Sequence, residues 1–448
     1  MIANWFVLCY KQFMSIWKQK NKILVTCPKG VATYLKAEME TLGFPVLNEI
    51  DTAIQTEGTL EDTMFLNLQL RTAQRVLYQI QTFKVASPGA LYERVNSIPW
   101  ETILHESGKR AYVCITSIVD NPLITDSRFV NVKVKDAIVD RIRDKCDARP
   151  DSGPDKDKAV VHVYWKNDQA IVYIDTSGDR LSLRGYRKIP LQAPMQETLA
   201  AAVILATGWR GKGAFVNPMC GSGTLAIEAA LIGLYRAPGL SRNNYGFMYV
   251  KGFPHEIWDE MRKKARNVAR KISARIIATD IDDAAVQAAR HNAQTAGVDH
   301  LIEFDTCPYE NTQIPEGNGI IMLNPPYGER MDAVMIKRQF PEAKKETRKG
   351  SSVIVRKAAD REIKDGGFKT NTLNRLEAAY EGIGDFFKKT GGGYRGYIFT
   401  GNLEMAKKVG LRTRRRLTFY NGEIECRLLE YELYSGSKKR PESDKESG

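Results

Sequence analysis

The feature that most constrains the fold is a strand, a glycine-containing turn and a helix in immediate succession. Ala214–Asn217 is a short apolar run, Gly221 and Gly223 follow it, and Thr224–Ile232 is apolar over the length of a helix. The same alternation appears in the flanking helices and strands Met195–Thr207, Ile276–Thr279, Asp283–Ala296 and Gly319–Leu323. Strand, glycine turn, helix and strand form the unit of a doubly wound sheet, so we predict an α/β, Rossmann-like domain.

The chain before residue 179 has a different pattern. Its short strands and helices do not repeat a βαβ order, which predicts an α+β region with antiparallel strands. The predicted elements are Ile23–Val25, Val31–Leu42, Ala111–Val119, Val132–Ile142, Val160–Trp165 and Ala170–Asp175. The segment Arg149–Lys158 is rich in Pro, Gly and Asp and is predicted to be a loop.

Charge and cysteine content narrow the class of protein. The 448 residues hold 66 Lys and Arg against 53 Asp and Glu, a net charge of +13 that favours a polyanionic partner such as nucleic acid. Seven dispersed cysteines form no C-x-x-C pair, which argues against a disulfide framework or a zinc site and fits a reducing cytoplasm. No apolar run reaches the roughly 18 residues of a membrane helix. Residues 1–21 lack the pattern of a signal peptide, and we expect an extension outside the core.

The glycine turn predicts a nucleotide-type ligand. Gly221 and Gly223 let backbone approach a ligand closely, and the helix that follows offers free N–H groups. The string also fits the dinucleotide pattern G-x-G-x-x-A, but that fold places an acidic residue about 20 positions on. Here Asp280 comes only after an insertion near 231–275, which counts against an NAD site. Asp280 could accept hydrogen bonds from both ribose hydroxyls or merely cap a helix, and Asp305 could accept from an adenine amine.

The sharpest signal for catalysis is Asn324-Pro325-Pro326-Tyr327, directly after a predicted strand. Two prolines stiffen the backbone at the strand end and remove two N–H donors. The Asn324 amide oxygen and the Pro325 carbonyl can each accept one hydrogen of an exocyclic amine, while the Tyr327 ring offers a stacking face for the base. A Pro-Pro turn plugged by an aromatic ring is the structural alternative.

These residues carry a resemblance to a known family. Asn324–Tyr327 resembles the N-P-P-Y motif of S-adenosylmethionine-dependent amino methyltransferases, and the extended Asn324–Arg330 resembles the THUMP-domain guanine-N2 RNA methyltransferases. Further blocks resemble the 23S ribosomal RNA (guanine-N2)-methyltransferases of RlmL type: Val132–Asp140, Arg184–Arg187, Ala193–Ala202, Met219–Ala230, Ala237–Leu240 and Tyr420–Gly422. The resemblance covers residues 22–435, apart from an insertion near 333–372.

The resemblance implies a domain order and a partner. The implied order is a ferredoxin-like region (22–65), a THUMP RNA-binding domain (66–178) and a Rossmann-like methyltransferase domain (179–435). The extension (1–21) lies outside the resemblance, and composition predicts a disordered tail (436–448). The implied cofactor is S-adenosyl-L-methionine, and no metal is expected. The implied partner is large-subunit ribosomal RNA, free or in a pre-ribosomal particle, met by a cytoplasmic monomer that does not bind membranes.

The motifs, a basic cluster at residues 412–416 and the resemblance together predict the roles of individual residues, although a solvated charged face is the alternative for that cluster. Catalysis falls to Asn324, Pro325, Pro326 and Tyr327. Cofactor binding falls to Pro194, Asn217, Pro218, Cys220, Gly221, Gly223, Thr224, Asp280, Ile281 and Asp305. RNA binding falls to Lys133, Lys135, Arg184, Arg187, Arg330, Arg414 and Arg415.

Three departures from the family pattern and three rival functions remain, and two of the departures, the insertion and the N-terminal extension, have no family counterpart. The family usually has Asp-Pro where this chain has Asn217-Pro218, so a neutral amide replaces a carboxylate beside the methionine moiety. An adenine-N6 methyltransferase acting on RNA or DNA would use the same four catalytic residues. A non-catalytic RNA-binding assembly factor would not need them, and a nicotinamide oxidoreductase would have no use for the N-P-P-Y strand end.

Overall fold

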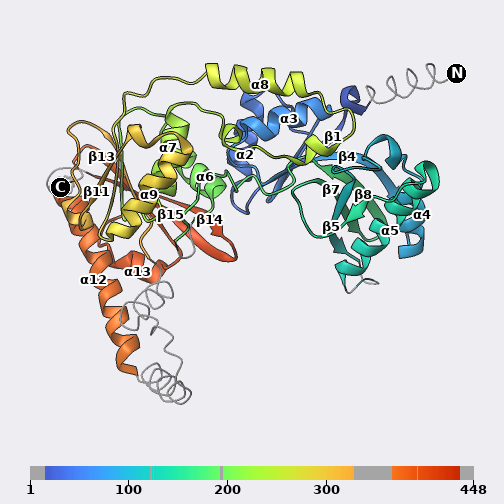
Figure 1. Ribbon diagram of the computed structural model, residues 1–448. Helices are drawn as coiled ribbons and strands as arrows, with labels where there is room; N and C mark the ends of the chain where they lie inside the picture. Colours follow the sequence, from blue (N-terminus) through green and yellow to red (C-terminus); the bar gives the residue numbers. More distant parts are fainter. Residues whose placement is uncertain are drawn as a thin grey trace, which may run out of the picture. The chain divides into compact units, whose positions relative to one another are not determined.

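The computed structural model describes residues 16–121, 124, 126–191, 195–326, 366–390 and 392–433. The chain forms two compact units (Figure 1). The first comprises residues 1–187, 196–208 and 231–271, and the second comprises 188–195, 209–230 and 272–448. Contacts therefore place three segments of the expected methyltransferase region, 179–187, 196–208 and 231–271, in the first unit.

The first unit is built on one eight-stranded sheet in the order β2-β3-β1-β4-β8-β7-β5-β6. Its strands are β1 (Asn21–Thr26), β2 (Asn48–Ile50), β3 (Ala53–Gly58), β4 (Arg75–Lys84), β5 (Tyr112–Asp120), β6 (Asp151–Ser152), β7 (Ala159–Lys166) and β8 (Gln169–Asp175). Most neighbours are antiparallel, as expected, but β5 runs parallel to both β6 and β7. The expected boundary near residue 65 falls inside a helix, and the sheet continues across it through β4.

In the described part of this unit, the α-helices include α2 (Ala32–Thr41), α3 (Leu60–Gln69), α4 (Pro88–Asn96), α5 (Ser127–Cys146), α6 (Glu197–Thr207) and α8 (His255–Asn267). Helix α5 is longer than the predicted Val132–Ile142 because both ends are capped. The Asp126 carboxylate accepts from the Arg128 N–H at 2.8 Å, and Asp147 ends the helix in the left-handed conformation at φ 50°. The predicted loop 149–158 contains the two-residue strand β6.

The beginning of the described chain corrects one expectation. Trp17 lies in the predicted extension, yet its side chain is only 3% exposed. Its indole Nε1 donates to the Lys251 carbonyl oxygen at 2.7 Å, and its ring lies 6.0 Å from that of Phe253. The sequence did not reveal this because a single tryptophan among lysines shows no periodicity. Trp17 is therefore part of the first unit's core, although residues 18–20 are exposed, and residues 1–15 lie outside the described range.

The second unit contains a seven-stranded sheet in the order β11-β10-β9-β12-β13-β15-β14. The strands are β9 (Ala214–Pro218), β10 (Ile276–Asp280), β11 (Ile302–Thr306), β12 (Gly319–Leu323), β13 (Tyr394–Thr400), β14 (Arg415–Asn421) and β15 (Ile424–Glu432). The first five are parallel, and β15 is antiparallel to both of its neighbours. This is the predicted doubly wound sheet, extended by a C-terminal hairpin.

The helices of this part of the chain are α7 (Thr224–Gly233), α9 (Asp283–Ala296), α12 (Gly366–Thr390) and α13 (Leu403–Lys408). Helix α12 covers one face of the sheet, where Tyr380, Ile383 and Phe387 pack in one cluster with Ile398 and Tyr431. Short 3₁₀ turns occur at Trp100–Thr102, Pro238–Ser241, Gly246–Tyr249, Asp299–Leu301 and Tyr309–Asn311. Among the described residues, no helix is long and apolar enough to cross a membrane.

The remaining sequence predictions fall largely outside the described residues. The predicted insertion 333–372 has described backbone only from residue 366, where α12 begins, and the predicted tail 436–448 has none. The predicted site residues Pro194, Tyr327 and Arg330 also lie outside the described range. Their roles stay predictions.

Candidate active site

The predicted site residues converge at the carboxyl edge of the second unit's sheet. Strands β9, β10, β11 and β12 are parallel, so their carboxyl ends and the segments that follow them meet at one edge. From β9 the chain continues to β10 on one side, whereas β12 lies on the other side. Ligands of doubly wound sheets bind at such a switch point, here between β9 and β12.

The segment after β9 is a tight turn fixed to the neighbouring strand. The Cys220 N–H donates to the Thr279 carbonyl at 2.9 Å, and the Gly223 N–H donates to the Cys220 carbonyl at 3.0 Å. Met219 and Gly221 both adopt positive φ, 55° and 54°. A left-handed non-glycine residue is uncommon and costs conformational energy. The sheet therefore holds this turn in a conformation that the sequence alone would rarely adopt.

The two glycines of the turn have different functions. A Cβ at Gly221 would meet nothing within 4 Å, so this residue faces open space, as a ligand-approach position requires. A Cβ at Gly223 would lie 2.8 Å from the Ala289 Cβ, and Gly223 has a φ of 80°. Packing against α9 therefore requires glycine at position 223, and its contact with a cofactor stays a prediction. Its missing side chain makes room for α9, and Thr224, just after it, is buried as the first residue of α7.

Asp280 at the end of β10 connects the glycine turn to the next helix. One carboxylate oxygen accepts from the Gly221 N–H at 2.9 Å, and the other accepts from the Asp282 N–H at 3.1 Å. The capping role that competed for Asp280 belongs to Asp282, whose carboxylate accepts from the Ala284 N–H at 3.0 Å. Burial raises the pKa of Asp280, and the nearby Asp282 charge adds to this, although the two N–H donors oppose it. Ile281 follows with 69% of its side chain exposed.

Asn217 joins β9 to β12 at the switch point. Its side chain is fully buried, and its Nδ2 donates to the Met322 carbonyl at 2.9 Å. Among the described residues, the buried Oδ1 atom has no hydrogen-bond partner. A buried acceptor without a donor is costly, and a cationic ammonium group would satisfy it. This acceptor lies at the switch point, on the strand that leads into the glycine turn.

The other cofactor candidates flank this centre. Pro218 is the buried last residue of β9, and Cys220 has a buried thiol whose pKa is raised by desolvation. Asp305 is exposed on β11, level with Thr279 on β10. It lies at the same carboxyl edge as Asp280, which is consistent with a contact to the far end of an adenosyl group.

The predicted catalytic segment leaves the same edge from β12. Asn324 and Pro326 are half-buried and Pro325 is buried. Because β12 pairs with β9, the segment begins beside the Asn217 turn, with the Met322 carbonyl as the shared contact. The structure therefore brings Asn217, Gly221, Asp280 and Asn324 to one edge of one sheet.

Comparison with known proteins identifies the parts. The descriptions of the matching family models are RlmL ferredoxin-like domain for residues 22–77, THUMP domain for 85–175, and RMKL-like methyltransferase domain for 184–364. The chain belongs to the RlmL-type family of THUMP-containing methyltransferases. It is 35% identical over 425 residues to the ribosomal RNA large subunit methyltransferase K/L of Syntrophotalea carbinolica, covering 92% of this chain and 53% of that protein. The chain thus spans about half the length of the curated relatives it matches.

Solved structures match nearly the whole chain. A possible methylase from Clostridium difficile 630 is 27% identical with a TM-score of 0.75, covering 94% of this chain and all of that one. A methyltransferase complexed with SAH is 23% identical with a TM-score of 0.73, again covering 94% of this chain and all of that one, and shows the shared fold. The RlmL-type order of ferredoxin-like, THUMP and methyltransferase regions agrees with the architecture predicted from the sequence.

Among the predicted RNA contacts, Arg184 is corrected. Its side chain is 2% exposed, and its guanidinium donates to the Leu181 carbonyl at 3.1 Å and to the Arg71 carbonyl. Because this guanidinium is buried in the first unit and donates to backbone carbonyls there, it cannot also contact an RNA phosphate at the surface. In this chain Arg184 therefore has a structural role, joining the segment at 181–184 to Arg71.

The other described candidates remain accessible to different degrees. Arg187 is half-buried and lies 3.5 Å from the Glu197 carboxylate. On α5, Lys133 lies over the Phe129 ring at 5.8 Å, and Lys135 contacts Asp136 at 2.5 Å. Arg414 and Arg415 are more exposed and share the buried Glu430 carboxylate, at 3.8 and 2.9 Å. Their contact with RNA stays a prediction.

Asn292 on α9 is a positioning residue that the sequence analysis missed. Its side chain is fully buried, and its Oδ1 accepts from the Lys188 and Ile189 N–H groups at 2.9 and 3.1 Å. Its Nδ2 donates to the Ser222 carbonyl at 3.2 Å. One side chain thus fixes the 188–189 segment to the glycine turn. The sequence feature that could have indicated this role is one asparagine on the alanine-rich face of the predicted helix 283–296.

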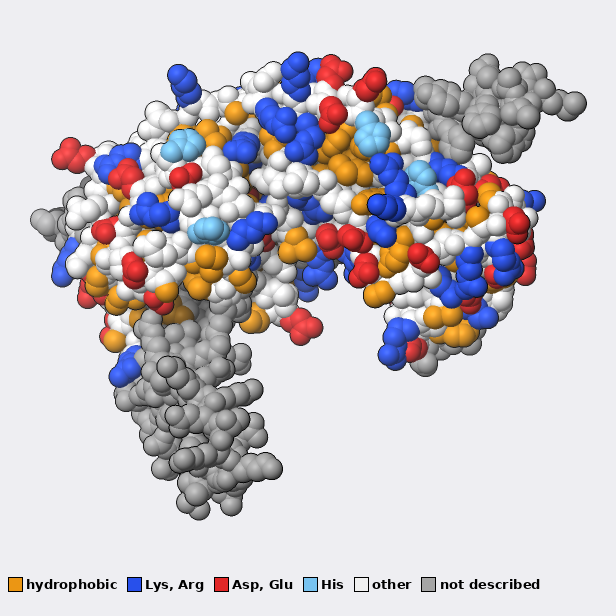
Figure 2. All heavy atoms as spheres, viewed as in Figure 1, with side chains coloured by type: hydrophobic (Ala, Val, Ile, Leu, Met, Phe, Trp, Pro, Cys, Tyr) orange, Lys and Arg blue, Asp and Glu red, His pale blue; other side chains and the backbone are white. Residues whose placement is uncertain are grey.

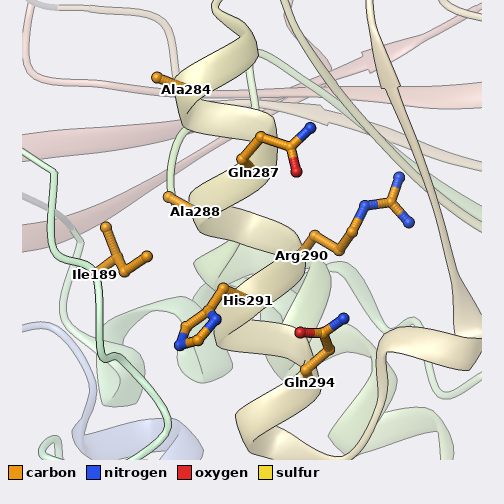
Figure 3. A pocket seen from close by; sticks show the side chains of 7 residues that line it. All are labelled: Ile189, Ala284, Gln287, Ala288, Arg290, His291 and Gln294. Atoms are coloured by element: carbon orange, nitrogen blue, oxygen red, sulfur yellow. The ribbon is translucent and has the colours of Figure 1, made fainter.

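A shallow cavity of about 450 Å³ lies on the outer side of α9. Figure 3 shows Ile189 facing the side of the helix that carries Ala288 and His291. None of the predicted catalytic or cofactor residues lines it, and its polar residues come from α9 alone. The carboxyl edge, where the predicted residues meet, remains the candidate active site. In the described part of the chain, no cluster of His, Cys, Asp or Glu side chains could hold a metal ion.

Proposed function

We propose that this protein transfers a methyl group from S-adenosylmethionine to the exocyclic N2 amine of a guanine in 23S ribosomal RNA. The observation that carries the proposal is the meeting of Asn324-Pro325-Pro326 with the glycine turn and Asp280 at one sheet edge. The relatives named as large subunit methyltransferases support the choice of RNA.

The residues at the edge fit the proposed cofactor. The Asp280 carboxylate would accept from the ribose hydroxyls, Gly221 leaves space beside it, and the unpartnered Asn217 Oδ1 would accept from the ammonium of the methionine moiety. Asp305 would contact the adenine amine from β11. When bound, the cofactor supplies an electrophilic methyl group on a sulfonium.

The catalytic segment would align the amine of the target base. A guanine N2 lone pair is delocalised into the ring, so the amine is a poor nucleophile. If the Asn324 amide oxygen and the Pro325 carbonyl each accept one amine hydrogen, the lone pair is directed away from both acceptors. Rigid acceptors at a strand end need no reorganisation during the reaction, so positioning supplies most of the rate enhancement. A strong general base is not required, because the proton can leave after the methyl group has been transferred.

RNA would be held mainly by the first unit. Its ferredoxin-like and THUMP matches, and the net charge of +13, support phosphate contacts by spread Lys and Arg side chains. The target base must leave its stack to reach Asn324. We infer that the enzyme acts as a monomer in the cytoplasm, on free ribosomal RNA or on a pre-ribosomal particle.

Nucleoside mass spectrometry of 23S ribosomal RNA from cells with and without the gene tests the proposal. We expect loss of one N2-methylguanosine in the mutant and its return when the gene is restored. Loss of N6-methyladenosine instead would assign the chain to the rival adenine-N6 reaction, because the same acceptors could hold that amine. An unchanged set of methylated nucleosides would indicate a non-catalytic assembly factor.

A further inference from the structure

The segment that interrupts the βαβ pattern carries much of the chain's positive charge. Residues 231–271 contain nine Lys and Arg against three Asp and Glu, and 9 − 3 = +6 of the total +13. Residues 261–271 alone contain six Lys and Arg and no acid. All of this segment belongs to the first unit, which also holds the THUMP match. A connection between two strands would not need this positive charge, so the charge requires a separate explanation.

The Lys and Arg side chains of helix α8 lie mainly on its exposed side. Trp258 and Ala265 are its buried residues, and the Trp258 ring packs at 5.0 Å from that of Phe247. Lys263 and Arg266 lie three positions apart on the exposed side, where such residues are neighbours. Arg270 and Lys271 follow the helix and are also exposed. Lys and Arg side chains lie over α8 on the face shown in Figure 2.

In the described part of the chain, acidic side chains form ion pairs with few of the Lys and Arg residues on and after α8. The helix's Glu260 pairs with Lys264 at 2.7 Å. Among the described residues, Lys263, Arg266 and Lys271 have no ion pair with an acidic side chain. Arg236 lies three residues after the end of α7, and its pKa is lowered mainly by burial and also by the Arg266 charge, so these two like charges lie close together. Unneutralised positive charges at a surface are stabilised by a polyanion.

An exposed aromatic ring lies beside these charges. Tyr235 is 42% exposed, and it adopts the left-handed conformation at φ 55°, which is rare for a bulky residue. The Arg270 guanidinium lies 4.9 Å from the centre of the Tyr235 ring. The Arg270 N–H donates to the Leu234 carbonyl at 2.8 Å, which ties the end of the basic segment to this ring. A ring and a guanidinium together form a surface on which a nucleobase can stack.

We propose that Tyr235, Lys263, Arg266, Arg270 and Lys271, the α8 basic patch, form a second RNA-binding surface, separate from the predicted THUMP contacts. The cations bind backbone phosphates of a single-stranded or looped segment of the substrate RNA, and Tyr235 stacks on one of its bases. The inference deepens the proposed function, since it assumes that RNA is the substrate. We choose RNA over an anionic membrane because the Tyr235 ring, with the Arg270 guanidinium 4.9 Å from its centre, offers a base a face on which to stack.

The test compares two triple variants that remove the same charge. One is Lys263→Gln with Arg266→Gln and Lys271→Gln. The control is Lys388→Gln with Lys407→Gln and Lys408→Gln, whose lysines each pair with an acid on α12 or α13. Binding of the full chain to protein-free 23S ribosomal RNA is measured by filter retention at several salt concentrations, and S-adenosylmethionine binding by calorimetry.

The patch variant should bind RNA at least about 10-fold more weakly, with a salt slope lower by about 2, since each lost phosphate contact removes roughly 0.7 to 0.9 from the slope. The control should stay within about 2-fold of the wild type. Both should bind S-adenosylmethionine normally, which shows that they are folded. Tyr235→Ala should weaken RNA binding about 10-fold, whereas Tyr235→Phe keeps the ring and should not.

Equal RNA affinity in the patch variant and the wild type would overturn the inference while leaving the proposed function intact. An equal loss in both triple variants would also overturn it, since only net charge would matter. A wild-type chain that binds no ribosomal RNA would overturn the inference and the proposed function together. Vesicles of phosphatidylglycerol and phosphatidylcholine provide the other arm, because selective loss of vesicle binding would show that the patch contacts membranes.

Discussion

The Asp280 carboxylate accepts a 2.9 Å hydrogen bond from the Gly221 backbone N–H, across the gap between β10 and the turn after β9. Together with the bond from the Cys220 N–H to the Thr279 carbonyl, this contact holds the glycine turn against the acidic end of β10. It also places the carboxylate beside the open space at Gly221, where a bound nucleoside would lie. The fit of the site to its proposed cofactor therefore depends on Asp280 more than on any other side chain.

Asp280→Ala should weaken S-adenosylmethionine binding by about 1.5–3 kcal/mol, because a methyl group cannot replace a charged acceptor of two hydroxyls. Calorimetry measures the change. Asp282→Ala is the matched control: it removes the α9 cap, at about 1 kcal/mol of folding stability, and should leave the affinity nearly unchanged. If Asp282→Ala lost the cofactor and Asp280→Ala did not, the ribose contact would belong to Asp282.

The affinity for S-adenosylmethionine should also depend on pH. Burial raises the pKa of Asp280, and ribose hydroxyls donate to its ionised form, so proton uptake removes an acceptor. Affinity should fall as the pH falls through this raised pKa, and Asp280→Asn should abolish that dependence. An Asp280→Asn variant whose affinity kept the wild-type pH profile would show that another group titrates.

The two glycines of the turn should respond differently to alanine. Gly223→Ala should destabilise the fold by about 2–3 kcal/mol, since its Cβ would collide with Ala289 at 2.8 Å and its φ is 80°. Gly221→Ala should cost only about 1 kcal/mol of stability but should weaken cofactor binding, because the new methyl group enters the open space. Urea unfolding and calorimetry separate the effects. Equal losses of stability would contradict the assignment.

His162 should make the first unit sensitive to mild acid. Burial on β7 lowers its pKa to about 4, and its ring lies 2.9 Å from the Thr116 hydroxyl. In the unfolded chain the ring protonates near pH 6.5. The free energy of unfolding should therefore be highest above that pH and should decrease as the pH falls from about 6.5 to 4. The full loss is about 3 kcal/mol. His162→Gln should flatten the profile in urea unfolding at pH 4–7.5, and an unchanged profile would assign the loss to other groups.

Trp17→Ala should destabilise the first unit by about 3–5 kcal/mol, because it removes a buried ring and its hydrogen bond to Lys251. The neighbouring Lys18→Ala removes only an exposed contact to Glu61 and should cost less than about 1 kcal/mol. Thermal unfolding compares them. Similar melting temperatures for both variants would restore the view that these residues lie outside the core.

Periodic and motif-bearing segments were predictable from the sequence. The strand Gly319–Leu323 and the helix Asp283–Ala296 have the predicted bounds, since apolar spacing and caps fix them locally. Long-range contacts were not predictable. No local pattern shows that Arg184 is buried against the Arg71 carbonyl, that Gly223 packs on Ala289, or that β5 runs parallel to β7. Each depends on a partner 66 or more positions away or on strand order.

The catalytic role of Asn324 can be separated from cofactor binding. Asn324→Ala should keep the S-adenosylmethionine affinity within about 2-fold yet slow methyl transfer by at least about 10²-fold, since it removes an acceptor that aligns the amine. Tyr327→Ala should lose activity and also roughly 1–3 kcal/mol of RNA binding, whereas Tyr327→Phe keeps the ring and should be milder. Full activity of Asn324→Ala in single turnover would exclude the proposed alignment.

The most direct test of the proposed reaction is a single-turnover transfer of labelled methyl from S-adenosylmethionine to 23S ribosomal RNA that lacks the modification. The purified chain supplies the enzyme, and the digested RNA is analysed for labelled nucleosides. The account predicts that the label appears in N2-methylguanosine and is absent from other nucleosides. Label in N6-methyladenosine, or no label from a chain that binds both the cofactor and the RNA, would contradict it.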